Sequence, residues 1–169
     1  MKLAVVDLGY GNLGSIAIAF ERFGVQPLVT ADLERIAGAE KVLLPGVGAA
    51  GFAMERIAAL GLAPVLRALT QPALGICLGM QLLFERSEEE DTVGLGVISG
   101  QVRRLEPTSE RPVPHMGWSA LEVDYDDIGL SSGDYVYFAH SFACDEGSAT
   151  ISRTFYGRSI PAVVRQANW

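Results

Sequence analysis

Apolar and polar residues follow two different patterns along the chain. In the first half, short and nearly continuous apolar runs alternate with segments whose apolar residues recur at helical spacing. Continuous apolar runs are typical of parallel strands covered on both faces, and their alternation with helices implies right-handed crossovers. The strands predicted here are 2–7, 25–30, 42–44 and 73–76, and the predicted helices are 13–23, 32–36, 52–60, 63–69 and 78–84.

The second half contains strand-like segments with little predicted helix between them, a pattern that favours antiparallel pairing. These segments are 97–105, 121–123, 135–139, 150–155 and 161–165. We therefore predict an α/β fold in one domain spanning residues 1–169, with a mostly parallel sheet flanked by helices and an antiparallel extension in the second half.

Two segments between these elements are predicted to be loops. Residues 85–91 carry five acidic side chains and are interpreted as a solvated loop rather than a metal site, because no histidine accompanies the carboxylates. Residues 106–115 contain three prolines and are predicted to form a stiff surface loop.

The composition narrows the possible functions. Hydrophobic residues make up 49% of the 169 residues and charged residues 20%, as in a globular α/β protein, and the apolar runs are too short to span a bilayer. Met1 and Lys2 lead straight into the first strand without a signal-peptide pattern, so we expect a cytoplasmic protein with no membrane partner. Thirteen basic against twenty acidic residues give a net charge of −7, which disfavours nucleic acid as a partner.

The chain has two cysteines, Cys77 and Cys144, and neither a CxxC pair nor a Cys/His cluster. A disulfide between them is not expected in a reducing compartment, and no metal site is predicted. Cys144 is interpreted as a passive thiol.

The surroundings of Cys77 indicate chemistry. Gly75 and Gly79 flank it at the spacing of a nucleophile elbow, in which the reactive side chain sits on a tight strand-to-helix turn. Small residues are needed there because the strand and the helix approach each other closely. The turn would place the sulfur at a helix N-terminus, where N–H groups and the helix dipole favour a thiolate. A buried cysteine packed as a small hydrophobe is the common alternative.

A second motif, Pro45-Gly46-Val47-Gly48, follows a predicted buried strand. Glycines in such a loop let backbone N–H groups turn toward a ligand, as the stabilisation of a developing oxyanion requires. On its own the motif would indicate an ordinary glycine-rich turn.

The glycines at 9–14 have the spacing of a dinucleotide fingerprint, but no acidic residue follows at the end of the second strand, so nucleotide binding is not predicted.

Together with Pro-His-Met-Gly-Trp at 114–118 and Tyr-Phe-Ala-His-Ser-Phe at 137–142, these motifs make the whole chain resemble the class I, triad-type glutamine amidotransferases. That resemblance implies a flavodoxin-like sheet. Within the class, the motifs are similar to those of the HisH family, the glutaminase subunits of imidazole glycerol phosphate synthase.

The resemblance implies that Cys77 attacks the side-chain amide of L-glutamine, forming a glutamyl thioester and releasing ammonia. Backbone N–H groups of Val47 and Leu78 would then hold the oxyanion. The residues that match glutamine-binding positions of the family are Gly48, Gln81, Ser141 and Phe142. No cofactor is implied.

The family's partner is a HisF-type (β/α)₈ cyclase subunit. The resemblance therefore implies a heterodimer in which the cyclase uses the ammonia to make imidazole glycerol phosphate and an aminoimidazole carboxamide ribotide, in L-histidine biosynthesis.

One part of the family pattern is missing. Members carry their general base in a His-Pro-Glu-type motif on a strand downstream of the one predicted here at 161–165, and this sequence reaches Trp169 without one. We therefore expect the domain to be incomplete at its C-terminus and the chain to have negligible glutaminase turnover. His140 or His115 could be nominated as a base from position alone, and the family assigns that role to neither.

Two other functions stay open. The first is a partner-binding module that lacks a base and performs no catalysis. The second is an amidotransferase domain of another pathway, such as anthranilate, carbamoyl phosphate or GMP synthesis. Met80 and the motif at 114–118 disfavour the second alternative.

Overall fold

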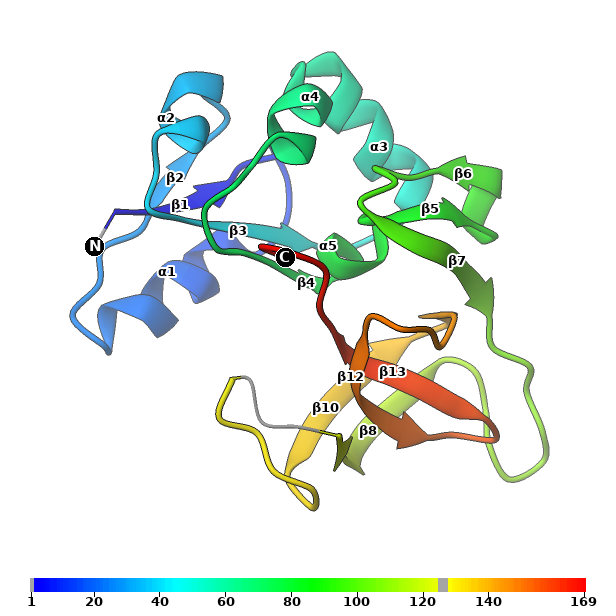
Figure 1. Cartoon of the computed structure of the whole chain (residues 1–169). Coiled ribbons are helices and arrows are strands. Elements are labelled where there is room, and N and C mark those ends of the chain that lie inside the picture. Colours follow the sequence, from blue (N-terminus) through cyan, green and yellow to red (C-terminus); the bar gives the residue numbers. More distant parts are fainter. Residues whose placement is uncertain (1, 125–127) are drawn as a thin grey trace.

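The computed structural model describes residues 2–124 and 128–169, which form a parallel sheet with helices and, beside it, three small sheets (Figure 1). The parallel strands, in spatial order, are β2 (Leu28–Thr30), β1 (Leu3–Val6), β3 (Lys41–Gly46) and β4 (Ala73–Cys77). Strands that follow one another along the chain are joined through helices, as the alternating apolar pattern predicts.

Helices cover the two faces of this sheet unequally. On one face α1 (Leu13–Glu21) lies against the buried side chains of Val5 and Leu43. The other face carries α2 (Leu33–Ala37), α3 (Ala50–Ala59) and α4 (Leu62–Arg67), which bury the larger core (Figure 1). No helix within the described part of the chain is long and apolar enough to cross a membrane.

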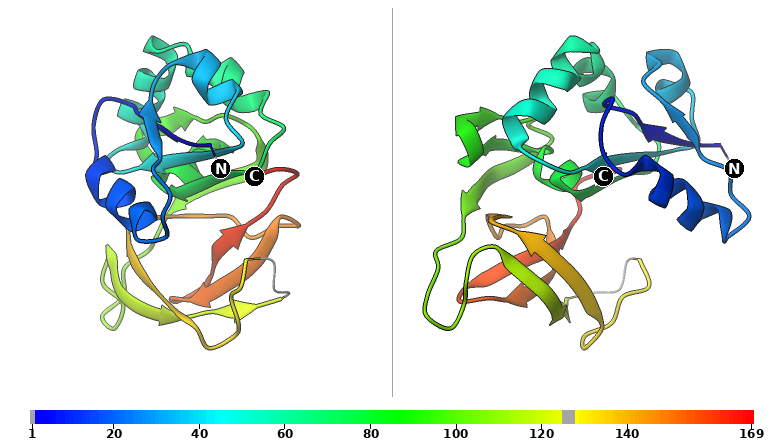
Figure 2. Two further views of the ribbon diagram at one scale, coloured as in Figure 1. Left: turned by 90° about the vertical axis from the view of Figure 1, so that its left-hand side faces the viewer. Right: turned by 180° about the vertical axis from the view of Figure 1, so that it is seen from behind.

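The second half forms mostly antiparallel strands, as predicted, but they do not continue the sheet from β4. One sheet contains β11 (Phe142–Cys144), β7 (Ile98–Arg104), β5 (Phe84–Ser87) and β6 (Thr92–Val93), and only its β5–β7 pair is parallel. The others are a ladder of β8 (His115–Ala120) with β10 (Tyr135–His140), and a sheet of β13 (Ser159–Val164), β12 (Thr150–Phe155) and β9 (Glu122–Val123). The views of Figure 2 show β8, β10, β12 and β13 below the helix-covered sheet.

The prediction of one helix over 78–84 was wrong. Helix α5 covers only Leu78–Gln81, and Phe84 begins β5, where it pairs with Ile98 of β7. Phe84 is 2% exposed, so its side chain is buried in the core where β5 pairs with β7.

The acidic segment 85–91 is largely solvent-exposed, as predicted, but it is not a loop. It contains β5 and a short 3₁₀ helix, η1 (Glu89–Asp91), and several of its carboxylates have protein partners. The Glu89 carboxylate accepts a hydrogen bond from the backbone N–H of Ala50 at 2.8 Å, at the start of α3. The Glu88 carboxylate accepts from Arg104 N–H at 2.8 Å. These carboxylates therefore link elements that are distant in the sequence. A run of acidic residues in the sequence does not reveal such hydrogen bonds.

Three glycines let β3, β4 and α5 lie almost backbone to backbone. A Cβ on Gly79 would stand 2.0 Å from the carbonyl oxygen of Leu44, and one on Gly46 would stand 2.4 Å from the Gly79 nitrogen. A Cβ on Gly75 would lie 2.7 Å from the Gly79 oxygen. Because every one of these neighbours is backbone, none of them can move aside cheaply.

Replacing Gly79 by alanine is therefore expected to lower the free energy of unfolding by about 1–3 kcal/mol, the usual range for overpacking a rigid core. Urea denaturation followed by circular dichroism measures the change. The matched control is Gly14→Ala, because a Cβ at Gly14 in α1 meets nothing within 4 Å. That control should be neutral or stabilise the fold by up to about 1 kcal/mol. Equal effects of the two substitutions would contradict the close-approach argument.

Candidate active site

Cys77 is the last residue of β4 and stands opposite Gly46 in the β3–β4 register. Its backbone has φ 55° and ψ −117°, a conformation that typically costs a non-glycine residue about 1–3 kcal/mol. The packing at Gly46, Gly75 and Gly79 holds it in place, and the thiol side chain is exposed. The predicted strand, turn and helix are therefore all present. Helix α5 has only four residues, however, so one turn of N–H groups replaces the longer helix dipole that was expected.

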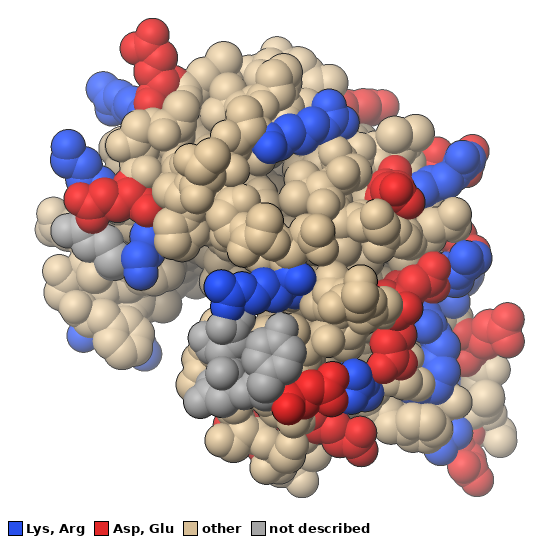
Figure 3. All heavy atoms as spheres, viewed as in Figure 1, with Lys and Arg blue, Asp and Glu red and all other residues tan. Residues whose placement is uncertain are grey.

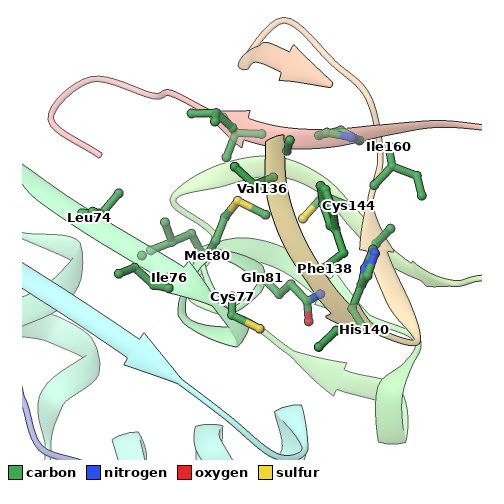
Figure 4. Close-up of a pocket in the computed structure, with 18 of the residues that line it drawn as sticks. Leu74, Ile76, Cys77, Met80, Gln81, Val136, Phe138, His140, Cys144 and Ile160 are labelled. Carbon is green, nitrogen blue, oxygen red and sulfur yellow. The ribbon is translucent and has the colours of Figure 1, made fainter. Parts of the chain in front are cut away.

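Two cavities meet at Cys77. The larger has a volume of 310 Å³ and is lined mainly by apolar side chains, with Gln81 and His140 among the polar ones (Figure 4). The smaller has a volume of 280 Å³ and lies between the loop after β1 and the Pro45–Gly48 loop, with Val47 in its wall. A reactant bound in either cavity could therefore reach the sulfur.

The structure brings some of the predicted site residues together. Gln81 points into the larger cavity, and its Nε2 donates a hydrogen bond to the backbone oxygen of Phe142 at 2.8 Å. Val47 shares the smaller cavity with Cys77. Leu78 is buried as the first residue of α5, directly after Cys77.

Other predicted residues do not line either cavity. Gly48 is exposed and has φ +83°, which suits glycine. Ser141 is half-buried, and its carbonyl accepts a hydrogen bond from Leu105 N–H at 2.9 Å. Phe142 contributes its carbonyl to the bond from Gln81 but does not line the cavity itself.

The two histidines form a pair that the sequence did not reveal. His115 was assigned to a proline-rich loop, and this was wrong, because it is the first residue of β8 and stands opposite His140 of β10. Nδ1 of His115 lies 3.0 Å from Nε2 of His140. On the far side of the pair, His140 Nδ1 lies 2.8 Å from the Phe142 oxygen, and His115 Nε2 lies 3.0 Å from Ser119 Oγ. The alternation of polar and apolar residues over 115–120 was the signal that could have revealed β8.

Burial shifts the pKa of both histidines and of Cys144. Desolvation lowers the pKa of His115, and the neighbouring His140 lowers it further. Desolvation also lowers the pKa of His140 against the opposing effect of its bond to Phe142 O, and the charge of Arg158 adds to the lowering. Burial raises the pKa of the Cys144 thiol to about 12, so this cysteine stays protonated near neutral pH, as expected of a passive thiol.

Comparison with known proteins identifies the family. The family model for class-I glutamine amidotransferases matches residues 4–166 of the chain. The chain belongs to the class-I glutamine amidotransferase family. The resemblance inferred from the motifs and the α/β fold inferred from the hydrophobic pattern are both confirmed.

Relatives of this amidotransferase include curated HisH subunits. Imidazole glycerol phosphate synthase subunit HisH 2 of Legionella pneumophila is 44% identical, over 99% of this chain and 85% of the relative. Subunit HisH of Xanthomonas campestris pv. campestris is 45% identical, over 96% of this chain and 83% of the relative. A crystal structure described as a glutamine amidotransferase has a TM-score of 0.73 at 20% identity and covers 98% of this chain and 85% of that chain, a likeness that concerns the fold alone.

Iodoacetamide at mildly alkaline pH is expected to modify Cys77 of the folded amidotransferase and to spare Cys144. The first thiol is exposed, whereas the second is 1% exposed and its pKa is about 12. Peptide mass spectrometry after timed quenching measures both rates. Unfolding in urea is the control and should make the two rates similar. Comparable modification of Cys144 in the folded protein would contradict its burial.

Proposed function

We propose that this chain is the glutaminase subunit of an imidazole glycerol phosphate synthase and that Cys77 is its nucleophile. Two observations support the proposal together. Curated HisH subunits are 42–45% identical to nearly the whole chain, and an exposed cysteine stands on a strained turn between two cavities.

The reaction begins with attack of the Cys77 sulfur on the carboxamide carbon of the glutamine side chain. The carbon–nitrogen bond breaks, and the nitrogen leaves as ammonia after taking up the thiol proton. The acyl group remains on sulfur as a glutamyl thioester. Water then cleaves the thioester, glutamate leaves, and the proton returns to the sulfur.

Backbone N–H groups of Val47 and Leu78 hold the oxyanion in this proposal. Val47 lies in the same cavity wall as Cys77, and Leu78 begins the helix directly after it. Loss of one such donor typically costs ~2.7–4 kcal/mol of transition-state stabilisation.

Glutamine itself is bound by the motif residues around α5 and β11 together with the 45–48 loop. These residues are Gly48, Gln81, Ser141 and Phe142. The hydrogen bond from Gln81 to the Phe142 carbonyl ties two of them together from opposite halves of the chain. Its length of 2.8 Å supports a shared role at one site.

The proposal gives neither histidine the role of general base. Both ring nitrogens of His140 and both of His115 have hydrogen-bonding partners, and the pair is mutually engaged. A base must be within reach of the thiol proton with a free lone pair. We therefore expect negligible glutamine turnover from these 169 residues, with acylation of Cys77 as the step that they support.

Ammonia released into water at neutral pH would be protonated and lose its nucleophilicity, so a partner must receive it directly. The partner in the proposal is a HisF-type (β/α)₈ cyclase that forms a heterodimer with this chain.

The outer face of the β8–β10 ladder supports such a contact. Its large side chains are 55–68% exposed, and the Trp118 and Tyr137 rings meet edge to face across the ladder, with centroids 5.6 Å apart. The exposed residues are Met116, Trp118, Tyr135 and Tyr137.

Nucleic acid is not part of the proposal. On the face shown in Figure 3, basic and acidic side chains are interleaved, and the basic residues do not gather into one stripe. With a net charge of −7, such a surface would gain little from displaced counterions on a phosphate backbone.

A glutamine-mimicking alkylator of the acivicin type is expected to label Cys77 with saturable kinetics, and excess glutamine is expected to slow the labelling. Mass spectrometry of the intact protein and its peptides measures the adduct. Cys77→Ser should abolish the label. The analogous change at the other thiol, Cys144→Ser, should leave it unchanged, because that thiol is buried and protonated.

Label at another residue, or none at all, would overturn the nucleophile assignment. If no label forms and the cyclase still binds, the chain acts as a partner-binding module without catalysis. Rapid glutamate release that His140→Ala abolishes would instead identify His140 as a base.

Replacing Trp118 by alanine is expected to weaken binding to a HisF-type cyclase at least tenfold, because an exposed aromatic at the centre of an interface is a common hot spot. Isothermal titration calorimetry with the purified cyclase measures the affinity. Val93→Ala is the control, since Val93 is 67% exposed on β6, outside the β8–β10 ladder. Unchanged affinity for the Trp118 variant would exclude this face as the contact.

A further inference from the structure

In the series of hydrogen bonds through the two histidines, the donor and the acceptor of each bond can be assigned. A backbone carbonyl can only accept, so His140 Nδ1, at 2.8 Å from the Phe142 oxygen, carries a proton. In the neutral ring Nε2 is then an acceptor, and His115 Nδ1 must donate to it across 3.0 Å. His115 Nε2 consequently accepts from the hydroxyl of Ser119 at 3.0 Å. The positions of the protons on Ser119, His115 and His140 are therefore all determined by the Phe142 carbonyl.

This series of hydrogen bonds ends at the Phe142 carbonyl, which accepts a second hydrogen bond as well. Phe142 O also accepts from Gln81 Nε2 at 2.8 Å, so both of its lone pairs are occupied. One donor comes from α5, next to Cys77, and the other from the end of β10. The carbonyl is therefore fixed from two sides.

We propose that His115 is a positioning residue for glutamine binding, because its Nδ1–H satisfies His140 Nε2 and so stabilises the His140 tautomer that donates to the Phe142 carbonyl and holds it against Gln81. This inference rests on the proposed function, since it assigns the 140–142 segment to glutamine. His115 touches no reacting atom in the proposal and acts only through His140.

The surroundings of His115 suit a fixed ring. It is 3% exposed and is stacked between Phe138 and Tyr156, with ring centroids 4.9 Å and 3.9 Å away and both interplanar angles at 17°. These stacking contacts and the two hydrogen bonds favour one orientation of the ring. The nearby groups that carry or can take a charge are Tyr156 and Arg158, and the Arg158 charge opposes protonation of His140.

The arrangement can hold one added proton but not two. A proton on His115 Nε2 would leave every contact intact, because the Ser119 hydroxyl can turn and accept. A second proton, on His140 Nε2, would set one N–H against another across 3.0 Å and break the pair. Burial lowers the pKa of both rings, so the pair should stay intact to a pH below the ordinary histidine pKa of about 6.5.

Nitrogen-15 NMR of the histidine rings tests the proposal without any need for turnover. Two-bond proton–nitrogen correlations distinguish the tautomers. We expect both His115 and His140 to be Nδ1–H tautomers at neutral pH. An Nε2–H tautomer at His140 would overturn the inference outright.

Variants connect the tautomer to ligand binding through the saturable labelling of Cys77 by the glutamine-mimicking alkylator. His115→Phe keeps a ring in the stack but removes the donor. It should shift His140 toward the Nε2–H tautomer and raise the half-saturating alkylator concentration about tenfold, with the limiting rate changed less than about twofold. His115→Asn can supply a donor near the same place and should restore most of the affinity and the Nδ1–H tautomer.

Two further variants distinguish the proposed effect from misfolding or a local change in packing. Ser119→Ala removes only the hydroxyl that donates to His115. It should change the His140 tautomer and the half-saturating alkylator concentration in the same direction as His115→Phe, but by less. Tyr156→Phe is the matched control, because it keeps the ring against His115 and removes a separate hydrogen bond to Pro112 O. It should match the wild-type protein in tautomer and affinity.

The outcomes separate this inference from the proposed function. No saturable labelling of Cys77 in the wild-type protein would refute the proposed function, whatever the tautomers are. Normal labelling with unchanged half-saturation in His115→Phe would refute the positioning role and leave the glutaminase proposal standing.

Discussion

The near contact of three backbone segments, at Gly46, Gly75 and Gly79, is the constraint on which the rest of the site depends. Because a side chain at any of these positions would collide with main-chain atoms, β3, β4 and α5 can meet only if all three are glycines. That contact gives Cys77 its positive φ and lifts its thiol from the end of the sheet. It also brings the Pro45–Gly48 loop beside the start of α5, so one packing event builds both parts of the predicted oxyanion site.

One carbonyl group of the second half of the chain bonds to both halves beside this site. Phe142 O receives Gln81 from the parallel body and His140 from the β8–β10 ladder. Its strand, β11, also joins the sheet that contains β5, directly after α5 in the chain. The two halves therefore meet at the site through short-range, directional bonds, which tolerate small displacements poorly.

The β8–β10 ladder has two faces with different roles in these proposals. Alternate residues on β8 point to opposite sides, so Met116 and Trp118 are exposed while His115 is buried one position away. The register then places His140 beside His115 and Tyr137 beside Trp118. A partner bound to the outer face would thus contact the same two strands that carry the histidine pair on the inner face.

The sequence by itself determined the alternation of strands and helices in the first half, the glycine-flanked turn at Cys77, and the family. These features are local: apolar periodicity and small residues at fixed spacing leave their mark within a few positions. Only the tertiary structure decided that α5 ends at Gln81, that Glu89 bonds to the start of α3, and that His115 pairs with His140. Each of these depends on a contact between segments distant in the sequence, and a strand register or a buried hydrogen bond is chosen by the packing of the whole chain rather than by neighbouring residues.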